Sequence, residues 1–153
     1  MSEPGAPPPA AAAGLLRRLA SLGYESLLLA ALLLAAGWLF LILSRNLDPV
    51  LARPALQLYL LALCGAYFAY CWTHGGQTLP MKTWRIRLVA RAGGAVTLAM
   101  GLQRYVYALL GIAACGLGFA WALIDRDGQF LHDRLAGTRL IAVPPTTSSP
   151  PPD

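Results

Sequence analysis

Three long apolar runs divide this chain, and polar or Pro-rich segments separate them. The runs cover about residues 22–43, 55–72 and 105–124, and the charge-free apolar stretches inside them are 17, 18 and 20 residues long. At about 1.5 Å per residue, a helix of that length covers roughly 25–30 Å, the thickness of the hydrocarbon core of a bilayer. The first two runs therefore predict transmembrane helices. The third predicts either a span or a re-entrant hairpin, because glycines at positions 116 and 118 could break it.

Shorter patterns flank the third run. Residues 84–89 alternate apolar and polar side chains, as strands do, and residues 138–143 are also strand-like. If both segments lie on one side of the membrane, they can pair as a short β-ribbon; otherwise each is an irregular interfacial segment. Between residues 91 and 105, Val96, Ala99 and Leu102 fit one helical face. This spacing predicts a short amphipathic helix on the cytoplasmic membrane surface.

The two ends of the chain differ in composition from the segment between them. Residues 1–14 are rich in Pro and Ala, and residues 144–153 are rich in Pro, Ser and Thr, so we expect both to be disordered tails. The membrane domain is expected at residues 15–143. The pattern predicts an all-α membrane protein with two or three transmembrane helices, a short amphipathic helix and a short β-ribbon.

Composition supports a membrane protein over a soluble enzyme or a disordered chain. Hydrophobic residues make up 57% of the 153 residues and charged residues only 12%, against about 25% charged residues in a typical soluble domain. The net charge of +5 does not indicate nucleic-acid binding, because no basic helix or aromatic-interleaved motif accompanies it. The three cysteines lie inside apolar runs and are read as small hydrophobic residues.

The distribution of Lys and Arg predicts the orientation. Residues 1–21 carry two, residues 44–54 two, residues 73–104 five and residues 125–153 three. Three full spans with a cytoplasmic N-terminus place seven inside and five outside, whereas two spans and a re-entrant third run place ten inside and two outside. Both alternatives put the N-terminus and residues 73–104 in the cytoplasm. We therefore expect a multi-pass membrane protein with a cytoplasmic N-terminus.

Two charged residues near the first run are candidates for chemistry. Arg18 and Glu25 are seven residues apart, so on a helix they face the same way, about 10.5 Å apart along the axis. Glu25 lies at the cytoplasmic edge of the first span, where an ionisable group is a functional candidate. It could bind a cation or cycle a proton, or the two residues could form a structural ion pair.

Other motifs give weaker signals. The segment from Gly75 to Lys82 lacks the spacing of a phosphate-binding loop. His74 and His132 are the only histidines and lack metal-ligand spacing, and no nucleophile accompanies His132 and Asp133. We therefore expect no catalytic residue, no metal site, no cofactor and no enzymatic activity. A basic segment without acids could instead form a lipid-facing surface; it contains Lys82, Arg85, Arg87, Arg91 and Arg104.

The combination of segments resembles the RDD family of small bacterial membrane proteins over about residues 15–143. Three pieces carry the resemblance. The first is Arg18-Leu19-Ala20 with an acid seven residues after the Arg. The second is Gly76-Gln77-Thr78, followed by Lys82 and the strand-like residues 84–89. The third and most specific is the sequence LHDRLAGT at residues 131–138.

The resemblance implies site residues, because the family is named for one Arg and two Asp. The Arg is Arg18, the first acid is Glu25, where the family usually has Asp, and the second is Asp133, with Asp125 as the alternative. The motif loop corresponds to the family's GQTPGK, but here its second Gly is missing and its middle differs. The family is associated with transport of unidentified ligands, and cation/proton exchange is suggested for some members.

Two functions therefore stand as expectations. The first is transport of a small ion or solute, with Arg18, Glu25 and Asp133 forming one charged site. Two or three helices cannot enclose a pathway, so transport requires a homo-oligomer or another membrane protein as partner. The second is a non-transporting adaptor that binds anionic membrane lipid, or another membrane protein, through the basic segment.

Overall fold

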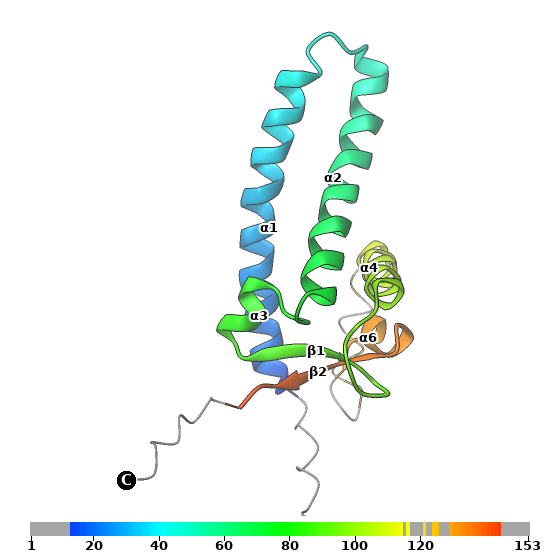
Figure 1. Ribbon diagram of the computed structural model, residues 1–153. Coiled ribbons are helices and arrows are strands. Elements are labelled where there is room, and N and C mark those ends of the chain that lie inside the picture. Colours follow the sequence, from blue (N-terminus) through cyan, green and yellow to red (C-terminus); the bar gives the residue numbers. More distant parts are fainter. Residues whose placement is uncertain (1–12, 115, 117–120, 122–123, 126–128, 145–153) are drawn as a thin grey trace, which may run out of the picture.

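The computed structural model describes residues 13–114, 116, 121, 124–125 and 129–144 of the chain. Its largest feature is a hairpin of two helices, α1 (Leu15–Leu43) and α2 (Pro49–Thr73), which stand side by side in antiparallel orientation (Figure 1). Both helices are long and apolar enough to cross a membrane. The two predicted transmembrane helices are thus present as helices of sufficient length.

Both helices begin earlier than their apolar runs. In α1, Arg17 and Arg18 do not delay the start, because Arg is a good helix former. In α2, the side chain of Asp48 accepts a hydrogen bond from the backbone N–H of Val50 (2.8 Å) and caps the helix. Pro49 follows at the first helical position, where its missing N–H is not needed.

The remaining elements gather where α1 begins and α2 ends (Figure 1). In chain order they are α3 (Leu79–Thr83), β1 (Ile86–Ala90), α4 (Leu98–Ala113), α6 (Leu131–Leu135) and β2 (Thr138–Ala142). We call these five elements, together with the adjoining turns of α1 and α2, the base.

The two strands confirm the predicted β-ribbon. They pair in antiparallel orientation, from Ile86 opposite Ala142 to Ala90 opposite Thr138. β1 precedes the third apolar run and β2 follows it, so their pairing brings the chain back to the side from which it left. Of the two predicted alternatives, a plain third span is incompatible with this ribbon.

The third run differs from its predicted boundaries. α4 continues through residues 104 and 105, so it joins part of the predicted amphipathic helix to the first half of the apolar run. It starts after Thr97, whose hydroxyl accepts a hydrogen bond from the N–H of Met100 (3.3 Å). Arg104 does not end the amphipathic helix because its charge is paired inside the base, as described below. The predicted break lies after the helix: Gly116 has a φ of +79°, and residues 115, 117 and 118 lie outside the described residues.

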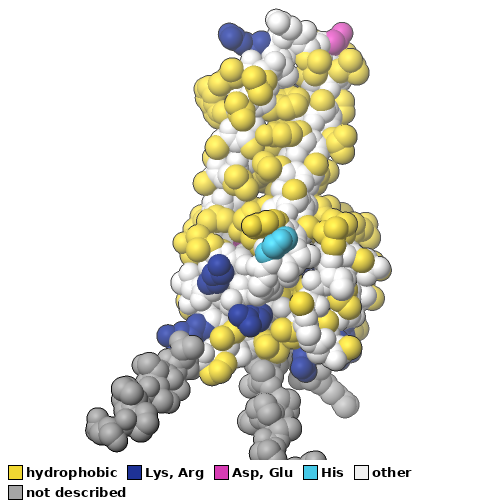
Figure 2. Space-filling model, in the orientation of Figure 1, with side chains coloured by type: hydrophobic (Ala, Val, Ile, Leu, Met, Phe, Trp, Pro, Cys, Tyr) yellow, Lys and Arg dark blue, Asp and Glu magenta, His cyan; other side chains and the backbone are white. Residues whose placement is uncertain are grey.

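The apolar core lies in the base. It contains Trp72 from α2, Met81 from α3, Ile86 and Leu88 from β1, Leu140 from β2, and also Ala13, Val96 and Phe130. Ala13 was predicted to belong to the N-terminal tail, but it is buried and its N–H donates to the carbonyl of Leu140 (3.2 Å). The hairpin above is mostly exposed, and apolar side chains cover its length between charged ends (Figure 2).

Candidate functional site

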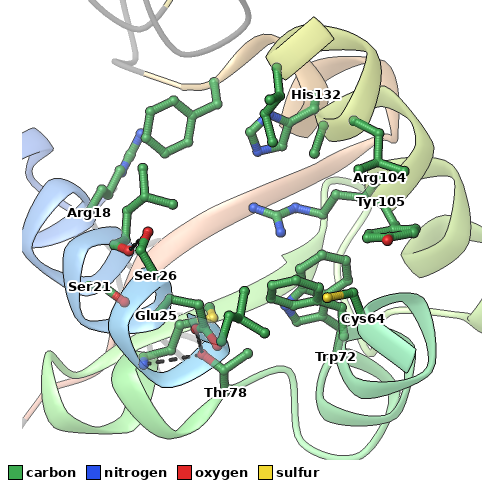
Figure 3. A pocket seen from close by; sticks show the side chains of 18 of the residues that line it. Arg18, Ser21, Glu25, Ser26, Cys64, Trp72, Thr78, Arg104, Tyr105 and His132 are labelled. Atoms are coloured by element: carbon green, nitrogen blue, oxygen red, sulfur yellow. Dashed lines mark hydrogen bonds between the residues drawn. The ribbon is translucent and has the colours of Figure 1, made fainter. Parts of the chain in front are cut away.

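A cavity of about 390 Å³ lies between the hairpin and the base. Side chains from α1, α2 and α4 form most of its wall, and α3, α6 and the ribbon contribute the rest (Figure 3). Its polar lining includes Arg18, Ser21, Glu25, Arg104 and His132.

The motif loop, which begins with Gly76-Gln77-Thr78, holds β1 in place and brings the hydroxyl group of Thr78 close to α1. Gly76 has a φ of +70°, and a Cβ there would lie 2.3 Å from the carbonyl oxygen of Leu88, so only Gly fits. Its carbonyl accepts from the N–H of Leu88 (2.7 Å), and the side-chain amide of Gln77 donates to the carbonyl of Ile86 (2.7 Å). Thr78 then caps α3 and turns its hydroxyl toward Glu25.

Glu25 is a buried carboxylate held by neutral donors. Its side chain is only 6% exposed, and it accepts hydrogen bonds from the hydroxyls of Tyr67 (2.8 Å) and Thr78. Within the described part of the chain, no Lys, Arg or His nitrogen lies within 4.0 Å of it. A carboxylate in this setting offers a binding position for a small cation.

Arg18 lies on the same face of α1 as Glu25, as their spacing predicts. Both side chains are buried and both line the cavity (Figure 3). The structural ion pair that the sequence left open does not form between them, because the two charges are not within 4.0 Å of each other.

Asp133 is brought to the same end of the molecule but binds a different Arg. Its carboxylate is 0% exposed, and Oδ1 accepts a hydrogen bond from Nε of Arg104 (2.7 Å) and forms an ion pair with Nη2 of the same residue (2.6 Å). The Arg104 guanidinium also lies 4.4 Å from the ring centre of Trp72, a cation–π contact. The predicted direct association of Asp133 with Arg18 and Glu25 is therefore replaced by an ion pair from α6 to α4.

Arg104 was assigned to an exposed basic surface, and this assignment is wrong. Its side chain is 7% exposed, because the aspartate and the indole ring cover it. Sequence reasoning missed the pairing because the partners are 29 positions apart in the chain, which hides any periodic relation. A single Arg between two otherwise apolar halves of one helix is the signal that could have suggested this buried ion pair.

His132 is a further residue of the site, although its position in the sequence matched no metal or catalytic motif. It lines the cavity, stacks on Phe130 (5.4 Å between ring centres) and places Nε2 3.7 Å from Oδ1 of Asp133. Burial, the largest cause, and the charge of Arg104 together lower the pKa of His132 to about 4, against an opposing effect of the Asp133 carboxylate. The imidazole is therefore neutral at physiological pH.

Asp125, the alternative second acid, makes a separate local contact. Its carboxylate forms an ion pair with Nε of Arg134 (3.0 Å) and accepts a hydrogen bond from the N–H of Gln129 (2.8 Å). It does not line the cavity.

A family comparison bears directly on these residues. The RDD family matches residues 12–137, which include Arg18, the motif loop and Asp133. The chain belongs to the RDD family. No curated protein and no solved structure matches it.

The RDD motifs converge on the base from distant parts of the chain. α1 supplies Arg18 and Glu25, the loop before α3 supplies Thr78, and α6 supplies Asp133. The motif residues of this RDD protein therefore connect the apolar hairpin to the ribbon and to α4, and Glu25 faces a cavity.

Four residues of the predicted basic surface are exposed on the same base. They are Lys82, Arg85, Arg87 and Arg91. Lys and Arg side chains are visible over this end of the molecule in Figure 2. Arg87 lies on β1 between two buried residues, so the strand alternation predicted from the sequence separates this charge from the core.

Proposed function

We propose that this RDD protein takes part in the transport of a small ion or solute, with Glu25 as the group that binds a cation or proton. The observation that carries the proposal is the setting of Glu25: a buried carboxylate that faces a cavity and is held by two neutral hydroxyls. Such a group gains most from a mobile positive charge, because no cation of the described residues balances it.

The proposed protein spans the bacterial inner membrane twice, with its N-terminus and base in the cytoplasm. The distribution of Lys and Arg supports this orientation, since ten lie in segments on the base side and two near the hairpin turn. A cysteine at Asn46 should then react with an impermeant thiol reagent in intact cells, and a cysteine at Ala92 should not, in a background without native cysteines. The reverse labelling would contradict this orientation.

Two helices cannot enclose a pathway, so the proposed transport unit is a homo-oligomer or a complex with another membrane protein. Small residues along α1 would permit close helix packing. They are Ala30, Ala31, Ala35, Ala36 and Gly37. The proposed role is not enzymatic.

The decisive experiment is ion flux in proteoliposomes containing the full chain. A Na⁺ or K⁺ gradient is applied, and an enclosed dye reports pH. Glu25→Gln should abolish cation-coupled proton movement, whereas Glu25→Asp should keep part of it, because the charge remains. Asp48→Asn, at the opposite end of the hairpin, is the matched control and should leave flux unchanged. Equal flux in Glu25→Gln and the native protein would contradict the proposal.

A second candidate function is a non-transporting adaptor that binds anionic lipid or another membrane protein. The exposure of Lys82, Arg85, Arg87 and Arg91 on the base favours it, since each basic residue near an anionic surface contributes about 1 kcal/mol. Replacing Arg85 and Arg87 by Glu should weaken binding of the purified protein to anionic vesicles. If vesicle binding is unchanged, these charges act only in setting the orientation of the protein in the membrane.

A further inference from the structure

The cavity changes in polarity along its length. The α1 residues that line it include Arg18, Ser21, Glu25, Leu29 and Leu33, which follow one another at three or four residues and so share one helix face. From Arg18 to Leu33 this face covers roughly 22 Å. It is mainly polar through Glu25 and apolar from Leu29 onward.

α2 contributes an apolar wall to the cavity. Its lining residues Leu61, Cys64 and Phe68 lead toward Trp72, which contacts Arg104 at the base. α4 adds Leu109 and Ile112 to the apolar part of the wall. The cavity therefore has one polar end and one apolar end, which is the form that an amphipathic molecule requires.

The polar end presents both signs of charge. Glu25 offers a carboxylate with no cation within 4.0 Å among the described residues. Arg104 uses Nε and Nη2 for Asp133, while Nη1 makes no hydrogen bond to the described residues, and its guanidinium points into the cavity (Figure 3). An amphiphile with an anionic head would meet the carboxylate as a like charge, and one with a cationic head would meet the guanidinium.

We propose that the cavity binds one zwitterionic phospholipid, with its ammonium at Glu25, its phosphate at Arg104 and part of one acyl chain between Leu29, Leu33 and Ile112. A volume of about 390 Å³ is at the lower end of the roughly 300–1,000 Å³ range for ligand pockets, which suits a head group and part of one chain. This proposal rests on the cation-binding role of Glu25 in the proposed function and names the ligand class.

The first arm of the test examines the chain site. The full-length protein in detergent is incubated with dioleoyl phosphatidylethanolamine, and bound lipid is counted by native mass spectrometry. Ala108→Phe fills the cavity from α4 and should remove the bound lipid; Leu33→Phe is an independent second block from α1. Ala99→Phe, on the exposed face of α4 outside the cavity, should retain it. Equal lipid retention in Ala108→Phe, Leu33→Phe and the native protein would place the lipid on the outer surface and overturn the proposal.

The second arm examines the head group. The native protein should prefer phosphatidylethanolamine to phosphatidylglycerol, and Glu25→Gln should lower that preference roughly tenfold, the effect of losing one hydrogen bond between charged partners. An unchanged preference would overturn the assignment of the ammonium to Glu25. The transport proposal and the lipid proposal can fail independently, because transport is measured as flux in vesicles and lipid selectivity is measured in detergent.

Discussion

The hairpin and the base of this protein are built from similar apolar residues but use them in opposite ways. Along α1 and α2, large apolar side chains such as Leu34 and Trp38 lie on the outside, with 68% and 69% of their surface exposed. In the base, Ile86 and Leu88 are almost completely buried, and so are the charged residues Arg104 and Asp133. The hairpin is thus suited to a lipid environment, whereas the base is packed like a small water-soluble domain.

This difference indicates where specificity resides. A lipid-facing side chain can be exchanged for another apolar one with little change in its surroundings, because lipid adapts to it. A base residue has defined neighbours, and a buried charge there is tolerated only beside its partner. We therefore expect substitutions in the base to have the larger effects on stability, and the following predictions test that contrast.

The largest effect is expected for Arg104→Leu. This substitution leaves the completely buried Asp133 without its partner, and breaking a buried ion pair costs about 3–5 kcal/mol. Denaturant unfolding in micelles, followed by tryptophan fluorescence, measures the change. Arg87→Leu on the exposed side of β1 is the control, with an expected change within about 0.5 kcal/mol. Similar losses in the two variants would show that the ion pair does not stabilise the base.

The next largest effect is expected when Gly76 and Gly37 are each replaced by Ala. At Gly76 the new Cβ would lie 2.3 Å from a backbone oxygen at a φ of +70°, which costs roughly 2–4 kcal/mol through strain and close contact. At Gly37, inside α1, the new Cβ meets nothing within 4 Å, and Ala should stabilise the helix by about 0.5–1 kcal/mol. Thermal unfolding of both variants measures the two changes in stability. If both substitutions stabilise the protein, or both destabilise it, the predicted contrast between Gly76 and Gly37 is wrong.

A pH-dependent effect of up to about 3 kcal/mol is expected from His132. Its folded pKa is about 4 and its ordinary value 6.5. Between these values the unfolded chain binds a proton that the folded protein does not, so stability falls as pH decreases from 6.5 to 4. Unfolding free energies across this range should show the decline, and His132→Gln should reduce it. If His132→Gln shows the same pH dependence of stability as the native protein, other groups cause the decline.

The smallest effect is expected in the hairpin. Leu34→Ala should change the stability of the reconstituted protein by less than about 1 kcal/mol, because this side chain is largely exposed on the hairpin and has few protein neighbours to lose. Leu88→Ala in β1 is the matched variant in the base, where removal of a buried Leu side chain costs about 2–5 kcal/mol. Equal losses of stability in Leu34→Ala and Leu88→Ala would contradict the difference between the hairpin and the base.

Several elements were predictable because their signals are local. A run of about 20 apolar residues predicts a membrane helix, alternation predicts a strand, and both signals are complete within one segment. The two hairpin helices and both strands of the ribbon follow from these patterns. The continuation of α4 through Arg104 did not, because it depends on a charge whose partner lies in another element.

The two long apolar helices, the strand-forming segments, the shared face of Arg18 and Glu25 and the family of the chain were thus all readable from the sequence. The pairing of Asp133 with Arg104, the place of His132 in the cavity wall and the hydrogen bonds of Thr78 and Tyr67 to Glu25 became visible only in the folded molecule. These partners lie far from one another along the chain. Periodicity reports which way a side chain points within its own element, whereas the partner of a buried charge is fixed by how separate elements pack.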